Sequence, residues 1–571
     1  MNFLRKKLFW ISFILLLFYS LSIFYRSDSS FDQDLGRHLR LGEIIVNTLE
    51  VPKINLFSYT NPDFPFINHH FLFGVILYIW SIFFSLQSFL YIKILILLTA
   101  VSLTLLNFRK TNSFLFMPLG YLFLHVLRER TDLRPEIFSF LFTALTLFIL
   151  EKFYTNKSKL IFFLPLIQLF WVNFHIYFFL GFVLQGIYLI DLFISKEFQK
   201  FKNLLWVLGI SIYASLFNPN GISGFFYPLS VFGNYGYTIA ENQNIFLLES
   251  INFVDHNFLF VKVCAIFIII SCFITLLKNP FSIKNNLIVV LGLGMALINI
   301  RSFPYLFFIS FPFVLTTFKK INKTVYALII VSSVLLIFES LMYLSGEYYK
   351  KIDAPIKSGL VLEENAKSAM NFILDKNLPQ PIYNNFDIGS YIIYRSYPRF
   401  KVFVDGRPES YPADFFTKVY IPSQSDYATF KDLENYYKFQ TTIFSITDQT
   451  PWGRNFLKNI LSDKDWSTIY LDDFIIVLIK NKELQNPRLT SINLENLSPE
   501  KYNFSNYFSY LRLSYFLYNC GYFQSSKTFS EKALSMYPDS RIANSLMFYF
   551  ESLENKGNSD YFLKSENNLW W

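Results

Sequence analysis

The chain has 571 residues, of which 53% are hydrophobic and 16% are charged, and its formal net charge is +9. Soluble domains carry about 25% charged residues, so the composition excludes an ordinary soluble enzyme. The excess of lysine and arginine does not indicate a nucleic-acid partner, because these residues cluster in short loops between apolar stretches, where they orient membrane proteins. The three cysteines, Cys264, Cys272 and Cys520, have a spacing that predicts neither a metal site nor a disulfide framework.

The N-terminal segment is basic from Arg5 to Lys7 and apolar from about Leu8 to Phe24. A signal peptide has the same layout, but no small-residue cleavage site follows this apolar run. We therefore predict an uncleaved first membrane span whose N-terminus lies in the cytoplasm.

Further apolar stretches follow one another up to about residue 345 and predict an α-helical protein that crosses the cell membrane many times. They lie near residues 69–86, 88–107, 112–127, 136–151, 160–174, 177–194, 203–217, 258–277, 285–300, 303–318 and 325–345. Basic loops at 109–110, 152–159, 196–202, 278–284 and 319–323 are expected in the cytoplasm. If every stretch crossed the membrane fully, a cytoplasmic N-terminus would put residue 346 in the cytoplasm as well, whereas the basic loops place it on the outer side. The region 69–107 is therefore expected to cross incompletely, which leaves about eleven spans.

This topology places the large first loop, residues 25–68, on the outer face of the membrane. The same face receives residues 128–136, 173–175, 218–257 and 301–302. These segments contain many of the polar residues that are unusual in a membrane protein. The expected topology follows from the apolar stretches and the basic loops and does not depend on these polar residues. Their convergence indicates an outward-facing site.

Three domains are predicted: a transmembrane domain over 1–345, an extracytoplasmic α/β domain over 346–499 and a helical tail over 500–571. The α/β domain is expected to hold an amphipathic helix at 357–376, strands at 381–383, 391–394, 400–404 and 439–445, and a hairpin over 466–480 that turns at Asp472-Asp473. In the tail, Leu513, Gly521, Phe523, Ala533 and Pro538 occupy the offsets of one tetratricopeptide helix pair. A single repeat cannot bury its apolar face alone, so the tail is expected to pack on the α/β domain or on a partner protein.

The first outer loop contains the segment Phe31 to Glu43, in which Asp32 and Asp34 form an Asp-x-Asp pair followed by Arg37 and His38. One carboxylate could act as general base on an acceptor hydroxyl while the other positions a metal ion or the substrate. The alternative is an ordinary polar loop whose acids pair with its arginines.

Two adjacent histidines, His69 and His70, begin the next apolar segment, and His175 interrupts another one. Histidines at such positions could bind a donor phosphate or shuttle protons, or they could be inert interfacial residues.

Arginines at 128, 130 and 134 lie on a predicted outer loop, against the usual preference of basic residues for the cytoplasmic side. A phosphate ligand would explain them, because guanidinium groups bind phosphate in a bidentate manner. The alternative is a salt-bridged loop with Glu129, Asp132 and Glu136 as partners. Arg301 is a stronger phosphate candidate, because no acid lies near it in the sequence.

Several motifs together resemble a group of bacterial membrane proteins related to the C-type glycosyltransferase superfamily (GT-C). They are Asp34 to Glu43, Val51-Pro52, Phe57 to Thr60, Asn68 to His70, Arg134 to Glu136, Asn173 to His175, Asn218 to Gly221 and Phe403 to Arg407. The segment Asn385 to Gly389 is similar to the Trp-Trp-Asp-Tyr-Gly motif of oligosaccharyltransferases but lacks its tryptophans.

This resemblance implies a GT-C-like membrane glycosyltransferase with an inverting mechanism. Its catalytic acid would be Asp32 or Asp34, and its donor would be a sugar linked to polyprenyl phosphate. Arginines or a divalent cation, Mg or Mn, would stabilise the leaving phosphate. The acceptor would be a glycan, a lipid or a protein. Two other functions remain open from the residues, an envelope lipid or polysaccharide transporter and a non-enzymatic assembly protein that binds partners through its tail.

Overall fold

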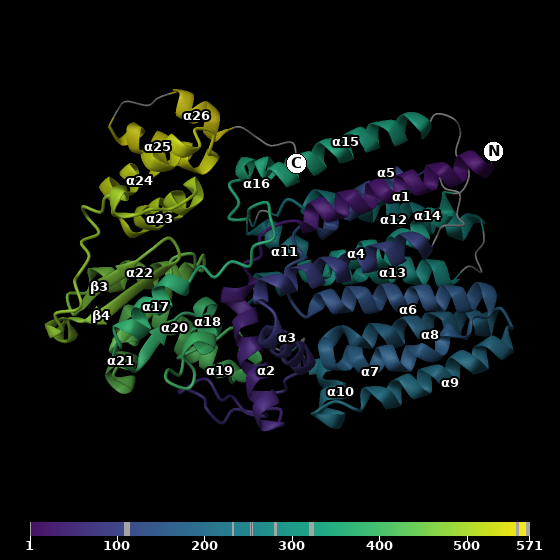
Figure 1. Cartoon of the computed structure of the whole chain (residues 1–571), viewed down its shortest axis with the longest axis horizontal. Helices are drawn as coiled ribbons and strands as arrows, with labels where there is room; N and C mark the ends of the chain where they lie inside the picture. Colours follow the sequence, from purple (N-terminus) through teal and green to yellow (C-terminus); the bar gives the residue numbers. More distant parts are fainter. Residues whose placement is uncertain are drawn as a thin grey trace.

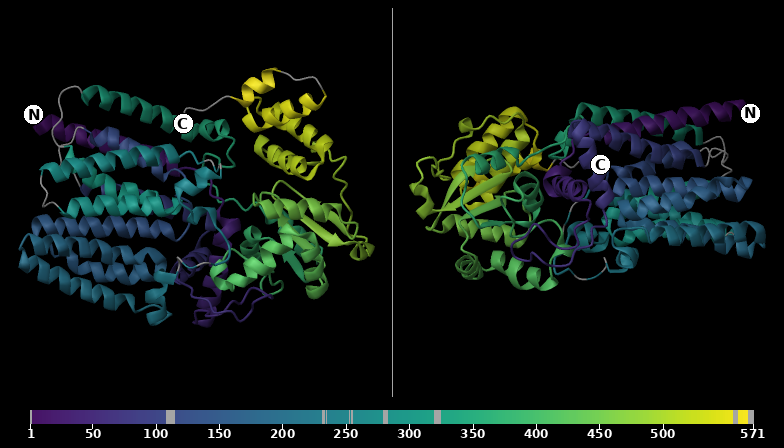
Figure 2. Two further views of the ribbon diagram at one scale, coloured as in Figure 1. Left: turned by 180° about the vertical axis from the view of Figure 1, so that it is seen from behind. Right: turned by 60° about the horizontal axis from the view of Figure 1, so that its bottom comes forward.

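The structure is a computed structural model that describes residues 2–107, 115–230, 233, 235–251, 253, 255–278, 283–318, 325–554 and 559–566. It consists of a long helical bundle, a mixed domain at one end of the bundle and a helical tail beside that domain (Figure 1). The N-terminus lies at the opposite end of the bundle from the mixed domain (Figures 1 and 2).

Seven helical segments of the described residues are long and apolar enough to cross a membrane. They correspond to α1 (Asn2–Phe24), α4 (Phe89–Asn107), α6 (Glu136–Asn156), α8 (Phe179–Ile194), α12 (Phe258–Lys278), α14 (Phe311–Thr317) with the turns before it, and α15 (Val325–Ser345). Shorter apolar helices include α3 (Phe71–Phe83), α5 (Phe116–Leu124), α7 (Leu164–Phe174) and α13 (Ile283–Ile298), and the bundle also contains α9 (Phe198–Ser215).

Helix α3 is too short to cross a bilayer. Its 13 residues extend over about 20 Å at 1.5 Å per residue, against an apolar core of about 30 Å. It packs against α2 (Gly36–Thr48) between the bundle and the mixed domain (Figure 1). An incomplete crossing was expected in this region, whereas the total of about eleven spans stays a prediction. The expected cytoplasmic loops at 109–110 and 319–323 lie outside the described residues.

The mixed domain is built on one four-stranded sheet with the order β1-β2-β4-β3. Strand β1 (Ile382–Asn384) runs parallel to β2 (Thr441–Ser445), and the hairpin of β3 (Trp466–Leu471) and β4 (Ile475–Lys480) pairs antiparallel to β2 through β4. The predicted hairpin is confirmed. Asp472 closes its turn, because its Oδ1 accepts hydrogen bonds from the backbone N–H groups of Phe474 (2.8 Å) and Ile475 (2.7 Å).

Two predicted strands of this domain are wrong, and one predicted helix begins later than expected. Residues 391–394 belong to helix α18 (Phe386–Ser396), because short apolar runs suit a buried helix as well as a strand. Residues 400–404 are extended but form only an isolated bridge, between Val402 and Ser58 of the first loop. The helix predicted at 357–376 begins only at Lys367 as α17 (Lys367–Asp375), since the backbone before it bonds to residues 27–28.

The tail contains α23 (Tyr507–Cys520), α24 (Phe523–Met536), α25 (Arg541–Leu553) and α26 (Ser559–Ser565). Its buried side chains, among them Leu513 and Phe529, share one hydrophobic core with Phe444 and Phe456 of the mixed domain. The tail therefore packs on the mixed domain, one of the two arrangements expected from its sequence. Its assignment as a tetratricopeptide-like unit stays a prediction.

Candidate active site between the bundle and the mixed domain

The loops that were predicted to face outward meet at the end of the bundle that carries the mixed domain (Figure 2). Glu241 forms ion pairs with Arg134 and Arg301, and the imidazole ring of His70 stacks on that of His175 with centroids 5.3 Å apart. Four loops distant in the sequence thus contribute side chains to one region. Which side of the membrane this end occupies stays a prediction.

Asp28 fixes the start of the first loop against the bundle. Its Oδ2 accepts a hydrogen bond from the backbone N–H of Leu133 at 2.6 Å and lies 2.9 Å from Lys93 Nζ, and both charged side chains are fully buried. Its Oδ1 accepts hydrogen bonds from the N–H and the hydroxyl of Ser30. A buried carboxylate is stable only with such partners. The pair therefore holds the first loop beside the loop that carries Arg134.

Asp32 is buried, and it bonds to residues 365–366. Its carboxylate accepts hydrogen bonds from the backbone N–H of Asn365 (3.0 Å), the Asn365 side-chain amide (2.9 Å) and the backbone N–H of Ala366 (3.2 Å). Burial raises its pKa to about 7, although these donors oppose the rise. Asp32 therefore holds the segment that leads into α17.

Asp34 has a different setting, because its side chain is 26% exposed. Its Oδ1 accepts a hydrogen bond from an Arg37 guanidinium nitrogen at 3.0 Å, and its Oδ2 lies 3.7 Å from Arg134 Nε. A Cβ atom at Gly406 would lie 3.8 Å from Asp34 Oδ1 and 3.3 Å from the Gln33 carbonyl oxygen, so the 403–407 loop closes over this segment. Asp34 is thus a partly exposed carboxylate at the junction of bundle and mixed domain.

Glu241 joins three arginines. Its carboxylate lies 2.8 Å from Arg130, 2.9 Å from Arg134 and 2.8 Å from Arg301. Burial opposes its ionisation, but the guanidinium groups outweigh burial and hold its pKa well below the ordinary value. The site predicted from the sequence included the arginines, whereas Glu241 was only a possible second acid in the loop 218–257. The available signal was Arg301, which had no acid near it in sequence and needed one elsewhere.

We call Asp34, Arg37, Arg130, Arg134, Glu241 and Arg301 the arginine cluster. A nearby third acid, Glu136, interacts with three of these arginines through space. Asp387 and Glu409 also interact through space with Asp34 and Arg37, so guanidinium groups outnumber carboxylates only within the cluster as defined. The cluster brings four guanidinium groups to one place, and such groups are the donors that bind an anionic ligand.

Aromatic contacts position Glu241. Tyr237 stacks on Phe386 of α18 with ring centroids 4.4 Å apart. Gly236 has a φ of +75°, and a Cβ there would lie 2.2 Å from the carbonyl oxygen of Ala413, so only glycine fits. The segment 235–241 is thereby attached to the mixed domain, which fixes Glu241 between this domain and the bundle.

Arg128 lies in another cluster. Its guanidinium group contacts Glu339 at 3.3 Å and the hydroxyl of Tyr343 at 3.0 Å, within the bundle. His125 and the hydroxyl of Tyr19 contact the same carboxylate at 3.2 Å and 2.8 Å. The structure does not bring Arg128 to Glu241, although Arg130 and Arg134 follow it by two and six residues.

The histidines form a row near the arginine cluster, where Arg37 interacts with His69 and Arg301 with His175. Ring centroids are 5.5 Å apart for His38 and His70, and 3.9 Å for His69 and His70. His175 Nδ1 lies 2.8 Å from the hydroxyl of Ser139, while His70 Nε2 is buried without a partner. Burial lowers the pKa of His69 to about 4 and those of His38 and His70 well below the ordinary value. These imidazoles are therefore neutral at pH 7.

The motif Asn385 to Gly389 also reaches this region. It forms the start of α18, where Asp387 interacts with Asp34 and Asp448; burial raises its pKa, and these two carboxylates raise it further. A Cβ at Gly389 would lie 2.2 Å from the Val404 carbonyl oxygen, so this glycine permits close approach of the 403–407 loop. Two motifs that were noted separately are thus in contact.

The expected divalent cation does not fit this arrangement. Asp34 and Glu241 both lie beside Arg134, and both are already paired with guanidinium groups. Within the part of the chain that the structure describes, no three His, Cys, Asp or Glu side chains are grouped so that they could hold a metal ion.

No family model matches the chain, and no curated protein matches it by sequence. Its fold is similar to that of the archaeal oligosaccharyltransferase AglB from Archaeoglobus fulgidus, solved in complex with an inhibitory peptide and a dolichol-phosphate. The TM-score is 0.56 at 10% identity, over 94% of this chain and 86% of AglB. A structure of the Archaeoglobus fulgidus oligosaccharyltransferase tethered with an acceptor peptide gives 0.53 at 11% identity, over 80% and 71%.

This likeness concerns the fold. The chain has a fold similar to that of this archaeal protein, with a helical bundle and a mixed domain at one end (Figure 1). Together with the apolar helices, it indicates a multi-pass membrane protein.

Proposed function

We propose that this chain is a membrane glycosyltransferase that moves a sugar from a polyprenyl-phosphate-linked donor to an extracytoplasmic acceptor. The observation that carries the proposal is the position of Asp34, a partly exposed carboxylate between Arg37 and Arg134 at the junction of bundle and mixed domain. A chain of the same fold has been solved with a dolichol-phosphate, which supports a lipid-linked donor.

Asp34, and not Asp32, is the base in this proposal. A general base needs free access to the proton that it accepts. Asp32 is 1% exposed and uses both oxygens on residues 365–366, whereas Asp34 is open to solvent on one side. Asp34 takes the proton of the acceptor nucleophile as that atom attacks the anomeric carbon, and the bond from this carbon to the phosphate oxygen breaks.

The arginine cluster stabilises the charge on the departing phosphate. Arg130, Arg134 and Arg301 share one carboxylate, so their remaining N–H groups are available to phosphate oxygens. Donors fixed in place before the reaction cost no reorganisation when the charge develops. The lipid tail would lie between helices of the bundle, which explains why the enzyme is embedded in a membrane.

The neutral histidines are assigned to the donor side. His69, His70 and His175 lie beside the arginine cluster, and His70 Nε2 is an unpartnered ring nitrogen. A neutral imidazole can donate one hydrogen bond without adding a charge. We assign them to orientation of the donor phosphate or sugar.

The test is a comparison of envelope glycans and glycoproteins, by mass spectrometry, in cells that carry the wild-type chain, Asp34→Asn or a deletion. We expect one defined sugar to be missing from both the deletion and Asp34→Asn, with the variant protein present in the membrane. Unchanged glycans in Asp34→Asn, when the deletion does change the envelope, would instead favour transport or assembly.

A further inference from the structure

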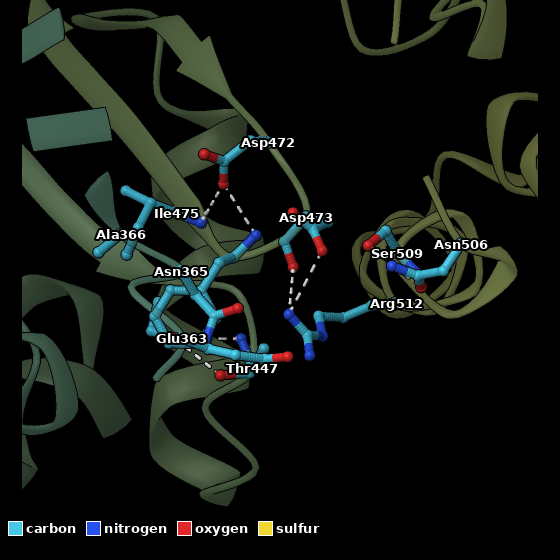
Figure 3. Close-up of polar contacts among 12 residues, drawn as sticks. Glu363, Asn365, Ala366, Thr447, Asp472, Asp473, Ile475, Asn506, Ser509 and Arg512 are labelled. Carbon is cyan, nitrogen blue, oxygen red and sulfur yellow. Dashed lines mark hydrogen bonds and ion pairs between the residues drawn. The ribbon is translucent and has the colours of Figure 1, made fainter. Parts of the chain in front are cut away.

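A cavity of about 560 Å³ lies where the first loop, the mixed domain and the tail meet. Its wall includes Gln33 from the first loop, Thr447 after β2, Phe474 in the β3–β4 turn, and Phe508 and Arg512 from α23. Figure 3 shows Arg512 extending from α23 toward the turn at Asp473, with Thr447 on the facing wall. Cavities of about 300–1,000 Å³ are the size that binds small ligands or short chain segments.

Gln33 connects this cavity to the arginine cluster. It lines the cavity, and its Oε1 accepts a hydrogen bond from Arg134 at 3.0 Å. Arg134 in turn lies 3.7 Å from the Asp34 carboxylate, and Asp34 follows Gln33 in the chain. A ligand that fills the cavity and contacts Gln33 therefore extends to the edge of the site that holds Asp34.

The charged groups of the cavity wall already have partners. Glu363 Oε1 lies 3.2 Å from Lys357 Nζ, and Arg512 lies 3.4 Å from the Asp473 carboxylate. The Arg512 guanidinium also lies over the Phe508 ring, 5.2 Å from its centroid. The wall thus offers no excess of either sign, so it does not favour a phosphate or a highly charged ligand.

The rest of the wall combines amides and hydroxyls with aromatic rings and with aliphatic side chains such as Leu511 and Ile542. Gln33, Asn365, Thr447 and Tyr515 supply both donors and acceptors, and Phe508 supplies a ring face. Sugars present hydroxyl groups around an apolar ring face, so they match a wall with both kinds of group. Sites built to bond hydroxyls discriminate strongly in favour of ligands that carry them.

The position of the cavity disfavours an extended peptide. Peptides that bind to sheets add a strand at an open edge and bond through their backbone. Here the sheet contributes only Ile446 and Thr447, which follow β2, and Phe474, which lies in the hairpin turn. Among the described residues that line the cavity, none belongs to a strand itself.

We propose that this cavity binds the glycan chain of a carbohydrate acceptor and delivers its end to Asp34. The inference rests on the proposed function and narrows it, because it selects a glycan among the acceptors. The tail then acts as one wall of an acceptor site, through Phe508, Arg512 and Tyr515.

The test measures binding of the purified full-length protein, fluorescently labelled in detergent, to a printed array of defined oligosaccharides and to an array of short peptides. We expect oligosaccharides to bind and Phe508→Ala to weaken their binding about tenfold, through loss of an aromatic contact. Tyr515→Phe, which removes only a hydroxyl, is expected to weaken binding about fivefold and keeps the test valid if Phe508→Ala fails to fold. Asn519→Ala, on α23 but outside the cavity wall, should bind as the wild type does.

Asp34→Asn separates this inference from the proposed function. It should bind oligosaccharides normally while transferring no sugar. Binding that depends on the cavity, in a wild-type protein that transfers no sugar, would overturn the proposed function and leave the cavity assignment standing. The glycan assignment would be overturned if Phe508→Ala weakened peptide binding, or if neither cavity variant changed oligosaccharide binding. In either case, sugar transfer by the wild type would still support the proposed enzyme.

Discussion

The arginines of one loop, residues 128–136, belong to two groups of charged residues that have opposite character. Arg128 and Glu339 pair inside the bundle with both side chains 2% exposed, and His125 and tyrosine hydroxyls occupy the remaining positions on the carboxylate. In the arginine cluster, Arg134 is 13% exposed, and Arg301 and Glu241 are 33% and 26% exposed. The first group is closed and balanced, whereas the second is open and has more guanidinium groups than carboxylates.

This difference indicates which arginines serve the fold and which serve a ligand. The free-energy cost of desolvating a buried ion pair is offset only by the contacts of that pair, so none of its donors is free for a ligand. An open cluster with unused donors can exchange part of its internal bonding for bonds to a phosphate. Arginines in one loop therefore cannot be assigned a function as a set, and each needs its own partners to be known.

Stability should separate the two groups most clearly. Glu339→Gln leaves Arg128 buried without a counter-charge and is expected to lower the free energy of unfolding by about 3–5 kcal/mol. Glu241→Gln is its matched variant and should cost less, about 1 kcal/mol, because water reaches its arginines. Denaturant unfolding in detergent measures both. Equal losses in the two variants would contradict the distinction between a closed and an open cluster.

Activity should depend more on the arginine cluster than on the buried pair of Arg128 and Glu339. Arg134→Gln removes the group that contacts Asp34, Glu241 and Gln33, and we expect kcat/KM for the lipid-linked donor to fall about 100-fold. The unfolding curve should shift little. Steady-state assays with reconstituted protein provide the measurement, and an unchanged kcat/KM would remove Arg134 from the phosphate site.

The two aspartates of the first loop divide in the same way. Asp32→Asn disturbs three hydrogen bonds to residues 365–366, so a loss of about 1–3 kcal/mol in unfolding free energy is expected, with transfer retained in the folded fraction. Paired assays of thermal unfolding and transfer distinguish the roles. Abolished transfer in a stably folded Asp32→Asn protein would return Asp32 to the catalytic position.

The histidine row predicts a pH dependence of stability. Burial lowers the pKa of His69 to about 4 in the folded protein, below its ordinary value of 6.5. The unfolded chain then binds more protons between these values, so stability should fall as the pH drops from 6.5 to 4, on the order of 1 kcal/mol per pH unit. His69→Asn should flatten the curve of melting temperature against pH, and a curve of undiminished slope would exclude His69 as the cause.

The smallest effect is expected from chelation. Because guanidinium groups already pair with Asp34 and Glu241, transfer should persist in EDTA, and added Mg²⁺ or Mn²⁺ should change the rate little. Rates measured before and after dialysis against chelator test this. A rate that disappears in EDTA and returns with Mn²⁺ would mean that a cation displaces the arginines.

Much of the helical architecture could be predicted from the sequence. Hydropathy located segments such as Glu136–Asn156 and Phe258–Lys278, and the hairpin turn at Asp472 followed from local residue preferences. Prediction failed where a short apolar run suited two structures, as in Phe386–Ser396, which is a helix. The motifs also resembled the GT-C superfamily, and the fold is similar to that of an archaeal oligosaccharyltransferase.

The partners of the charged residues were decided by the tertiary structure alone. Arg134 meets Glu241, Arg128 meets Glu339, and Asp32 holds Asn365, across 107, 211 and 333 residues of sequence respectively. Local composition offered nearer acids, such as Glu129 and Asp132, for the same arginines. Hydrophobicity acts on each segment by itself and so can be read along the chain, whereas an ion pair depends on which segments the folded bundle brings together.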